Sequence, residues 1–339
     1  MKIHENITIQ ELYAADELSS MRGNWISSVN DQWIQTATDK SLEDIHAQNP
    51  TWGLADMLKG IRRVSKVASS GLQFVFFVYK EEEICTSPDK VQTQLIFLPA
   101  EGEKKEEYIL LLAGGAYGAV CSLPEALPAA AELNKLGYSC FCLNYRTAYQ
   151  ESFEKGLMPE PLEDVAASLR FIRDKKDLFG VNPEQYLLGG FSAGGHAAAM
   201  WGTAHRGARH YSLSQPKGLI LAYPMVSSEL LPKNPMAEWV KRGMYGREYT
   251  EADEQNYSVD RHIDPAYPPV YLARAADDDT VPDDHHQRLI RALKNKDVRV
   301  CLEEADRGGH GFGAGSDTPL KGWLQRATEF LYGTERETS

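Results

Sequence analysis

Residues 185–196 read Gln185-Tyr-Leu-Leu-Gly-Gly-Phe-Ser-Ala-Gly-Gly-His196. The apolar half of this stretch predicts a strand, Gln185–Gly189, and an alanine-rich helix is expected from Ala193 onward. Between them lies glycine–x–serine–x–glycine, a pattern typical of a sharp turn that exposes a serine at its apex. Glycine is needed on both sides because a side chain there would collide with the neighbouring strand or helix. The stretch indicates that Ser192 is a nucleophile, with a helix start that only packs closely as the alternative.

Strands and helices alternate over most of the remaining chain. The predicted strands are Phe74–Tyr79, Val91–Pro99, Tyr108–Ala113, Tyr138–Asn144, Gln185–Gly189, Lys217–Tyr223, Val270–Arg274 and Arg299–Glu303. The predicted helices are Pro124–Leu136, Pro161–Lys175, the helix from Ala193, and Lys321–Tyr332. Such alternation is typical of a parallel sheet with right-handed crossovers. We therefore predict an α/β fold, a mostly parallel central sheet with helices on both faces, in which the first two strands form an antiparallel hairpin at one edge.

Two segments fall outside this alternation. Residues 1–70 have a polar, aromatic-dotted helical pattern and predict a helical N-terminal extension, packed on an α/β domain of residues 71–335. Residues 225–262 form a long insertion with one predicted helix, Met236–Met244. Long insertions in compact domains are often lids or binding loops. We expect the insertion to act as a cap or lid, and both segments to roof a pocket.

The composition excludes several classes of protein. The 339 residues carry 36 Lys and Arg against 48 Asp and Glu, a net charge of −12, which argues against nucleic-acid binding. No apolar run approaches the roughly 20 residues that cross a bilayer. The first residues, Met1-Lys-Ile-His-Glu-Asn-Ile-Thr8, lack the apolar core of a signal peptide, so we expect a cytoplasmic protein.

Cysteine and histidine spacings give no sign of a metal site. The five cysteines form an odd set without ligand spacing, so we expect reduced core thiols, no metal and no cofactor. His196 lies one helical turn after Ser192 and is expected to pack rather than react. His285 and His286 begin a helix after Pro282 and are expected to be solvated.

Three further motifs each follow a predicted strand. Ala113-Gly-Gly-Ala-Tyr-Gly118 lets backbone N–H groups approach the oxyanion that acyl transfer creates. Ala276-Asp-Asp-Asp-Thr-Val-Pro282 can supply a carboxylate that orients an imidazole; Asp278 is preferred and Asp277 is second, while a helix cap or an acidic turn explains the others. Gly308-Gly-His-Gly-Phe-Gly313 places His310 in an accessible loop, as a general base requires.

Together these motifs make the chain resemble the serine esterases of the α/β-hydrolase fold, in particular the group of carboxylesterases and acetyl or xylan esterases. The motifs that carry the resemblance are Gly114-Gly-Ala-Tyr117, Asn144-Tyr-Arg146, Gly190-Phe-Ser-Ala-Gly-Gly-His196, Ala276-Asp-Asp-Asp-Thr-Val-Pro282 and Gly308-Gly-His-Gly-Phe-Gly313. Their order, Ser192 before Asp278 before His310, is the order of the serine, acid and histidine in that fold.

The resemblance implies a role for each of these residues. Ser192 would be the nucleophile, Asp278 the acid and His310 the base. The oxyanion would be held by the backbone N–H groups of Ala193 and of Gly115 or Ala116, with Tyr117 beside it in contact with the substrate. Ala113 and Ala116 stand where lipases and esterases carry the histidine and the third glycine of a His-Gly-Gly-Gly stretch.

The implied activity is hydrolysis of short-chain carboxylic esters, with O-acetyl groups on carbohydrates among the candidate substrates. Another serine hydrolase of the same fold is the first alternative, a peptidase, a thioesterase or a formamidase. A catalytically inactive ligand-binding module is the second, but such modules usually lose a triad residue and all three are present here. The expected partner is a small ester, with no nucleic acid and no membrane. The sequence leaves open whether the chain forms a homo-oligomer.

Overall fold

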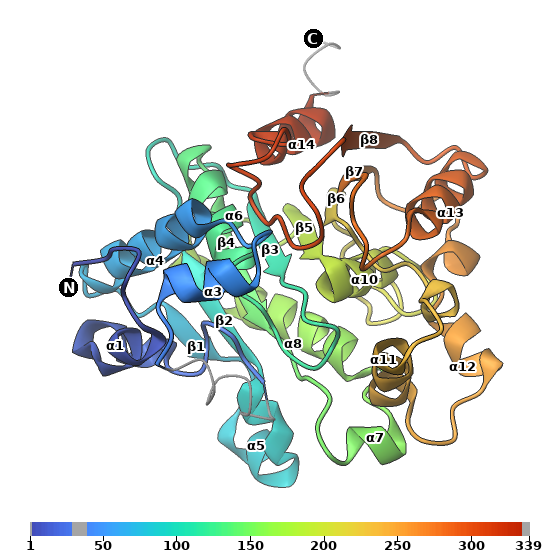
Figure 1. The fold of residues 1–339 in the computed structure, drawn as a ribbon, viewed down its shortest axis with the longest axis horizontal. Helices are drawn as coiled ribbons and strands as arrows, with labels where there is room; N and C mark the ends of the chain where they lie inside the picture. Colours follow the sequence, from blue (N-terminus) through green and yellow to red (C-terminus); the bar gives the residue numbers. More distant parts are fainter. Residues whose placement is uncertain (1, 29–38, 334–339) are drawn as a thin grey trace.

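The computed structural model describes residues 2–28 and 39–333, and the strands in these ranges form one eight-stranded sheet. Its order is β1-β2-β4-β3-β5-β6-β7-β8. The strands are β1 (Val75–Phe77), β2 (Gln94–Leu98), β3 (Tyr108–Leu112), β4 (Ser139–Asn144), β5 (Tyr186–Phe191), β6 (Gly218–Ala222), β7 (Val270–Ala275) and β8 (Val300–Ala305). β2 runs antiparallel to both β1 and β4, and all other neighbours are parallel. The predicted α/β fold with an antiparallel edge is confirmed (Figure 1).

The link between β1 and β2 is longer than the expected hairpin turn. It contains the short helix α5 (Glu81–Thr86) and the 3₁₀ helix η2 (Pro88–Gln92). The first turn of α5 holds three glutamates, which the positive end of a helix dipole favours, and η2 begins at a proline. Without a stripe of apolar residues, glutamates and a proline at the starts of short helices are easily interpreted as a charged turn, as the sequence predicted here.

Helices cover both faces of the parallel part of the sheet. The helix α6 (Ala126–Lys135) connects β3 to β4, and α8 (Glu160–Asp174) leads from β4 back past β3 to β5. These two right-handed crossovers run in opposite directions across the sheet, so their helices lie on opposite faces. The helix α14 (Trp323–Tyr332) packs with α6, whereas α10 (Ser192–Trp201) packs with α8. No helix in the described ranges has the length and apolar character that a membrane crossing needs.

The change of direction at β3 creates the place where a site is expected. β4 lies on one side of β3 and β5 on the other. In open α/β sheets, ligands bind outside the carboxyl ends of the strands at such a switch point. The segments that follow β3, β5, β7 and β8 all begin at this edge of the sheet, because these strands are parallel.

The described part of residues 1–70 is helical and packs on the sheet domain. It contains α1 (Ile9–Ala14), the 3₁₀ helix η1 (Asp16–Met21), α3 (Leu42–Gln48) and α4 (Leu54–Ala68). The helix α4 packs along α6, and the buried Arg63 on it donates 2.7 Å to the side chain of Asn134. In Figure 1 α4 lies beside α6, and α1, α3 and α4, drawn in blue, lie far from α11 and α12. Residues 334 and 335 of the predicted α/β domain lie outside the described residues.

The insertion between β6 and β7 contains short helices and no strand in its described residues, which cover all of 225–262. They are the 3₁₀ helix η3 (Ser228–Leu230), α11 (Pro235–Tyr245), α12 (Glu251–Asn256) and the 3₁₀ helix η4 (Val259–His262). The helix predicted at Met236–Met244 corresponds to α11. Asn234 caps α11 by accepting the N–H of Ala237 at 2.8 Å, and Pro235 occupies its first turn.

Candidate active site

Ser192 stands at a sharp turn between β5 and α10. Its backbone φ is 49°, a left-handed value that non-glycine residues rarely adopt and that is often found at functional sites. A Cβ at Gly194 would run into the carbonyl oxygens of Leu112 and Ala113, and one at Gly190 would lie 2.8 Å from the Cβ of Ala198. The two glycines of the motif therefore allow the turn to pack tightly between β3 and α10. This is the geometry that the sequence pattern predicts.

His310 lies within hydrogen-bond distance of both other candidate residues. Its Nε2 is 2.8 Å from the Oγ of Ser192, and its Nδ1 is 2.8 Å from the Oδ2 of Asp278. The His310 side chain is 18% exposed whereas that of Asp278 is 1% exposed. The imidazole is thus open to a substrate on one side and held by a buried carboxylate on the other.

The surroundings of Asp278 favour its ionised form. Its Oδ1 accepts the backbone N–H groups of Thr280 and Val281, each at 2.9 Å. Burial alone would raise the pKa of Asp278, but the hydrogen bond and charge of His310 and these two N–H groups hold the pKa below its usual value. Asp278 is therefore an anion that can stabilise a protonated His310.

The neighbouring aspartates have different positions. Asp277, the second choice for the acid, accepts the backbone N–H of Gly309 at 2.7 Å and so ties down the histidine loop rather than the ring. Asp279 lines the cavity beside Ser192. Of the three adjacent carboxylates, the structure places Asp278 against the imidazole.

The segment 113–119, named here the oxyanion loop, carries unusual backbone geometry. Gly115, Ala116 and Tyr117 have φ values of 128°, 54° and 60°. Within the described residues, the N–H groups of Gly115 and Ala116 donate to no other protein group. Ala193 lies in the first turn of α10, where N–H groups have no acceptor inside the helix. Ala116 and Ala193 line the same cavity as Ser192, so their N–H groups are available to an oxyanion there.

Tyr117 does not take the position expected for a substrate contact. Its side chain is 1% exposed, and its hydroxyl lies 2.7 Å from the Nδ1 of His196. The Nε2 of His196 lies 2.7 Å from the carbonyl oxygen of Tyr257, which assigns the ring proton to Nε2 and makes Nδ1 the acceptor. Burial lowers the pKa of His196 to about 4, so this ring is neutral. Tyr117 therefore connects the oxyanion loop to the insertion through His196, and its side chain is not among those that line the cavity at Ser192. A substrate contact of Tyr117 stays a prediction.

Two residues of the Asn144-Tyr-Arg146 motif form hydrogen bonds to segments around the site. The Tyr145 hydroxyl donates 2.6 Å to the carbonyl oxygen of Ala113, at the start of the oxyanion loop. Arg146 is buried and donates to Asp164, with an Nε–Oδ1 distance of 2.9 Å. These contacts connect β4 to the oxyanion loop and to α8.

The cavity at Ser192 is about 310 Å³ and mainly apolar. Most of its apolar lining comes from the insertion, namely Met225, Leu231, Pro232, Met236, Ala237 and Val240, with Val281 from the loop after β7. None of the described residues before 71 lines it. The insertion therefore forms most of the wall of this cavity. Residues 51 and 52 nevertheless lie close to the loop of His310, since a Cβ at Gly309 would be 2.5 Å from Thr51 and one at Gly311 would be 2.9 Å from Trp52. A roofing role for residues 1–70 stays a prediction.

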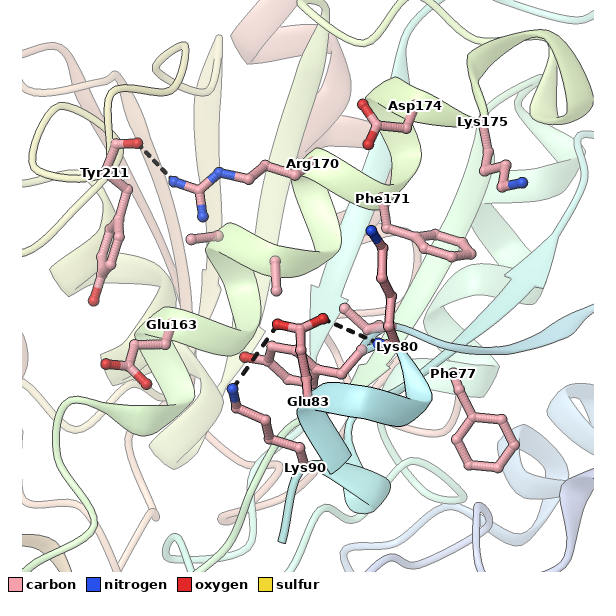
Figure 2. A pocket seen from close by; sticks show the side chains of 14 residues that line it. Phe77, Lys80, Glu83, Lys90, Glu163, Arg170, Phe171, Asp174, Lys175 and Tyr211 are labelled. Carbon is pink, nitrogen blue, oxygen red and sulfur yellow. Dashed lines mark hydrogen bonds and ion pairs between the residues drawn. The ribbon is translucent and has the colours of Figure 1, made fainter. Parts of the chain in front are cut away.

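A larger cavity of about 780 Å³ lies elsewhere, between α8 and the segment from β1 to η2 (Figure 2). Its rim mixes bases (Lys80, Lys90, Arg170, Lys175) with acids (Glu83, Glu163, Asp174). Glu83 is engaged by Lys90 and by the backbone of Lys80, and Arg170 donates to the carbonyl oxygen of Tyr211. No residue of the candidate triad lines this cavity, so size alone does not identify the site.

Two histidines differ from their expected surroundings. His285 and His286 lie in α13 (Asp283–Lys294) and are buried, not solvated. Burial lowers the pKa of His285 to about 4 and that of His286 to about 3, so both rings are neutral. The Nδ1 of His285 accepts the N–H of Val226 at 3.0 Å, which fixes the start of the insertion.

The cysteines differ from the expected core placement in part. Cys140 and Cys142 are buried, whereas Cys85 is exposed, and all five thiols are free. In the described ranges, no three His, Cys, Asp or Glu side chains are grouped so that they could hold a metal ion.

Two residues that no motif in the sequence indicates, Glu125 and Tyr223, lie next to the candidate triad. Glu125 is 3% exposed and accepts the N–H of Gly114 at 2.5 Å and the hydroxyl of Tyr223 at 3.0 Å. The only hint in the sequence is a lone carboxylate in the otherwise apolar run from Leu123 to Ala131.

The sheet order and the segments that meet at Ser192 define an α/β-hydrolase fold. A family model labelled BD-FAE matches residues 95–293, more than half of the chain. The chain belongs to the BD-FAE family.

Solved structures support the same fold. An acetyl ester-xyloside bifunctional hydrolase from Caldicellulosiruptor lactoaceticus is 24% identical with a TM-score of 0.65, covering 77% of this chain and 96% of that one. A carboxylesterase from Lactobacillus plantarum is 21% identical with a TM-score of 0.58, covering 72% and 92%. Because the sequence identities are only 24% and 21%, these similarities support the fold alone.

Two curated relatives match by sequence. An acetylxylan esterase from Xylanibacter ruminicola is 28% identical over 238 residues, which are 68% of this chain and 45% of the relative. Endo-1,4-beta-xylanase B from Butyrivibrio fibrisolvens is 27% identical over 225 residues, 65% of this chain and 34% of the relative. The chain spans less than half the length of both relatives.

Proposed function

We propose that this chain is a serine esterase that hydrolyses short-chain carboxylic esters through Ser192, His310 and Asp278. The observation that supports this most is the pair of 2.8 Å contacts that join the three side chains, although His310 is 118 residues from Ser192 and 32 from Asp278. Packing alone gives no reason for a hydroxyl, an imidazole and a buried carboxylate to line up in this order. The arrangement is that of a nucleophile, its base and the group that orients the base.

The proposed reaction has two steps. In the first, His310 Nε2 takes the Ser192 proton as Oγ bonds to the ester carbonyl carbon, and the resulting oxyanion accepts the N–H groups of Ala116 and Ala193. The C–O bond to the alcohol then breaks, and His310 returns the proton to the leaving oxygen. In the second, His310 deprotonates a water that attacks the acyl-enzyme, and Ser192 leaves reprotonated. Asp278 stabilises the imidazolium in both steps.

The substrate class rests on the cavity and on the relatives. The apolar wall beside Ser192 suits the hydrocarbon part of a small acyl group better than a charged one. One curated relative is named an acetylxylan esterase, and one similar structure is named for an acetyl ester activity. We propose short acyl esters, with O-acetylated carbohydrates as the first natural class to test. A cytoplasmic location and the absence of nucleic-acid partners stay predictions.

The acyl preference is testable with p-nitrophenyl esters of increasing chain length. We expect kcat/KM to rise from acetate to butyrate by at most about fourfold per methylene, since each buried CH₂ contributes about 0.8 kcal/mol. Ala237→Leu, which extends a side chain into the cavity, should lower kcat/KM for butyrate and leave acetate near the wild-type value.

The type of bond cleaved is a separate test. A matched acetyl thioester and an acetyl anilide should be poorer substrates than the oxygen ester. Preference for the anilide over the ester would favour a peptidase or an amidase instead.

The proposed base predicts a loss of activity in acid. Only neutral His310 can accept the Ser192 proton, so kcat/KM should fall as the pH drops from about 8 to 5. The pKa of Asp278 lies below its usual value, so this carboxylate stays ionised over that range and does not cause the decline. A pH–rate profile with p-nitrophenyl acetate measures the effect. A profile that is flat over this range would rule out His310 as the base.

A further inference from the structure

The buried carboxylate of Glu125 joins two segments that the proposed reaction needs. Glu125 immediately precedes α6 and is 3% exposed. Its Oε2 accepts the N–H of Gly114, at the start of the oxyanion loop, at 2.5 Å. Its Oε1 accepts the hydroxyl of Tyr223, which follows β6, at 3.0 Å. Both carboxylate oxygens therefore accept a hydrogen bond, one from each of the two segments.

Tyr223 extends this connection to the loop that carries His310. Its hydroxyl accepts the N–H of Gly313 at 3.1 Å while donating its own proton to Glu125. Its ring lies edge-on to the imidazole of His310, with a centroid distance of 4.8 Å, and edge-on to Phe312 at 4.6 Å. The Tyr223 backbone has a φ of 38°, so the residue is held in this place against its own backbone preference.

We propose that Glu125 is a positioning residue of the esterase reaction, which holds the oxyanion loop through Gly114 and the His310 loop through Tyr223 in one fixed arrangement. The inference rests on the proposed function, because it assumes that the oxyanion loop and His310 act on the same substrate carbonyl. Catalysis by fixed N–H donors depends on their placement, and a shift of about 1 Å can cost about 100-fold in rate.

The charge of Glu125 also bears on His310. Burial raises the pKa of Glu125 to about 7. The N–H of Gly114, the charge of His310 and the hydroxyl of Tyr223 act in the opposite direction and lower this pKa, but burial has the larger effect. The other titratable groups around it are Tyr223, Tyr145 and Cys121, and burial raises the pKa of each far enough to keep it neutral. His310 is therefore the neighbour whose charge changes during the reaction, and an ionised Glu125 favours its imidazolium form.

The raised pKa of Glu125 predicts that its ionisation lowers the stability of the folded protein, and this effect can be measured separately from catalysis. A pKa raised above that of the unfolded chain gives stability that is present in acid and lost as the pH rises through about 7. Glu125→Gln removes that loss and keeps an oxygen that can accept the N–H of Gly114. Its Tm should therefore equal or exceed that of the wild type at pH 8, and the difference should shrink at pH 5.

The test compares Glu125→Gln, Tyr223→Phe and the double variant on p-nitrophenyl acetate. Each single variant should lower kcat by about 10- to 100-fold with KM nearly unchanged. The double variant should lose little more than either single one, because the two side chains act as one unit. Tyr267→Phe is the matched control: its buried hydroxyl donates to Ala199 at 2.7 Å, away from the cavity, and its removal should leave kcat unchanged.

The outcomes separate this inference from the proposed function. Wild-type kcat in Glu125→Gln, or single losses that multiply in the double variant, would overturn the positioning role while leaving the esterase intact. A loss of kcat accompanied by a lower Tm at pH 8 would also contradict it, because the carboxylate would then be a structural support. An inactive wild type that does not react with a fluorophosphonate would contradict the proposed function instead.

Discussion

Replacing Ser192 with alanine is expected to lower kcat for p-nitrophenyl acetate by about 10⁶-fold, the loss typical of removing the nucleophile of a triad. The alanine has no oxygen to attack the ester carbonyl, and His310 then has no proton to accept. The remaining N–H donors and the cavity still bind the ester, so some rate above that of water should persist. Single-turnover and steady-state assays with stopped-flow detection cover the required range.

The variant should fold as the wild type does. The Oγ of Ser192 contacts His310, and loss of one partly exposed hydroxyl removes no buried packing. Circular dichroism and Tm should be nearly unchanged. If Ser192→Ala kept the wild-type kcat with an intact fold, the proposed nucleophile would be wrong.

The second large effect is expected at Asp278. Asparagine in this position still accepts the N–H groups of Thr280 and Val281 through its oxygen, but it turns an amide NH₂ group toward His310 Nδ1. The ring must then carry its proton on Nε2, where it cannot accept one from Ser192. We expect Asp278→Asn to lower kcat by about 10⁴-fold with a small change in KM.

Asp277→Asn provides the matched control for this prediction. Asp277 contacts the backbone N–H of Gly309, which an asparagine oxygen can also accept, and it does not touch the imidazole. The chain thus offers two adjacent aspartates of which one should be essential and the other dispensable. A larger loss in Asp277→Asn than in Asp278→Asn would reverse the assignment of the acid.

The fold and the turn at Ser192 could be predicted because their signals are local. Each buried parallel strand is a short apolar run, and the turn needs two glycines at fixed distances from the serine. The chain order of Ser192, Asp278 and His310 then restricted the arrangement further, because each residue follows a different parallel strand. Such patterns need no knowledge of distant contacts.

The position of Tyr117 could not be predicted, because it depends on backbone conformation. Two consecutive non-glycine residues with positive φ turn its side chain into the core, where His196 receives the hydroxyl. Nothing in a glycine-rich loop sequence shows to which side such a side chain points. The burial of His285 and His286 has a different origin, because α13 is covered by the insertion, and Val226 of the insertion is 59 residues from His285.

Glu125 could not be predicted because both of its partners are defined by the folded sheet. Gly114 is 11 residues away and Tyr223 is 98 residues away. A glutamate at the start of a helix usually favours the helix dipole and stays in water. In this protein Glu125 is instead buried next to Ser192, near the end of β3, where the strand order changes direction.

In the proposed reaction, His310 and Asp278 activate Ser192 as a nucleophile. Reaction with a fluorophosphonate, followed by mass spectrometry of the labelled peptide, tests it most directly. The wild type should acquire one phosphonyl group on Ser192, and Ser192→Ala should acquire none. A folded wild type that stays unlabelled, or that carries the label on another residue, would contradict the claim.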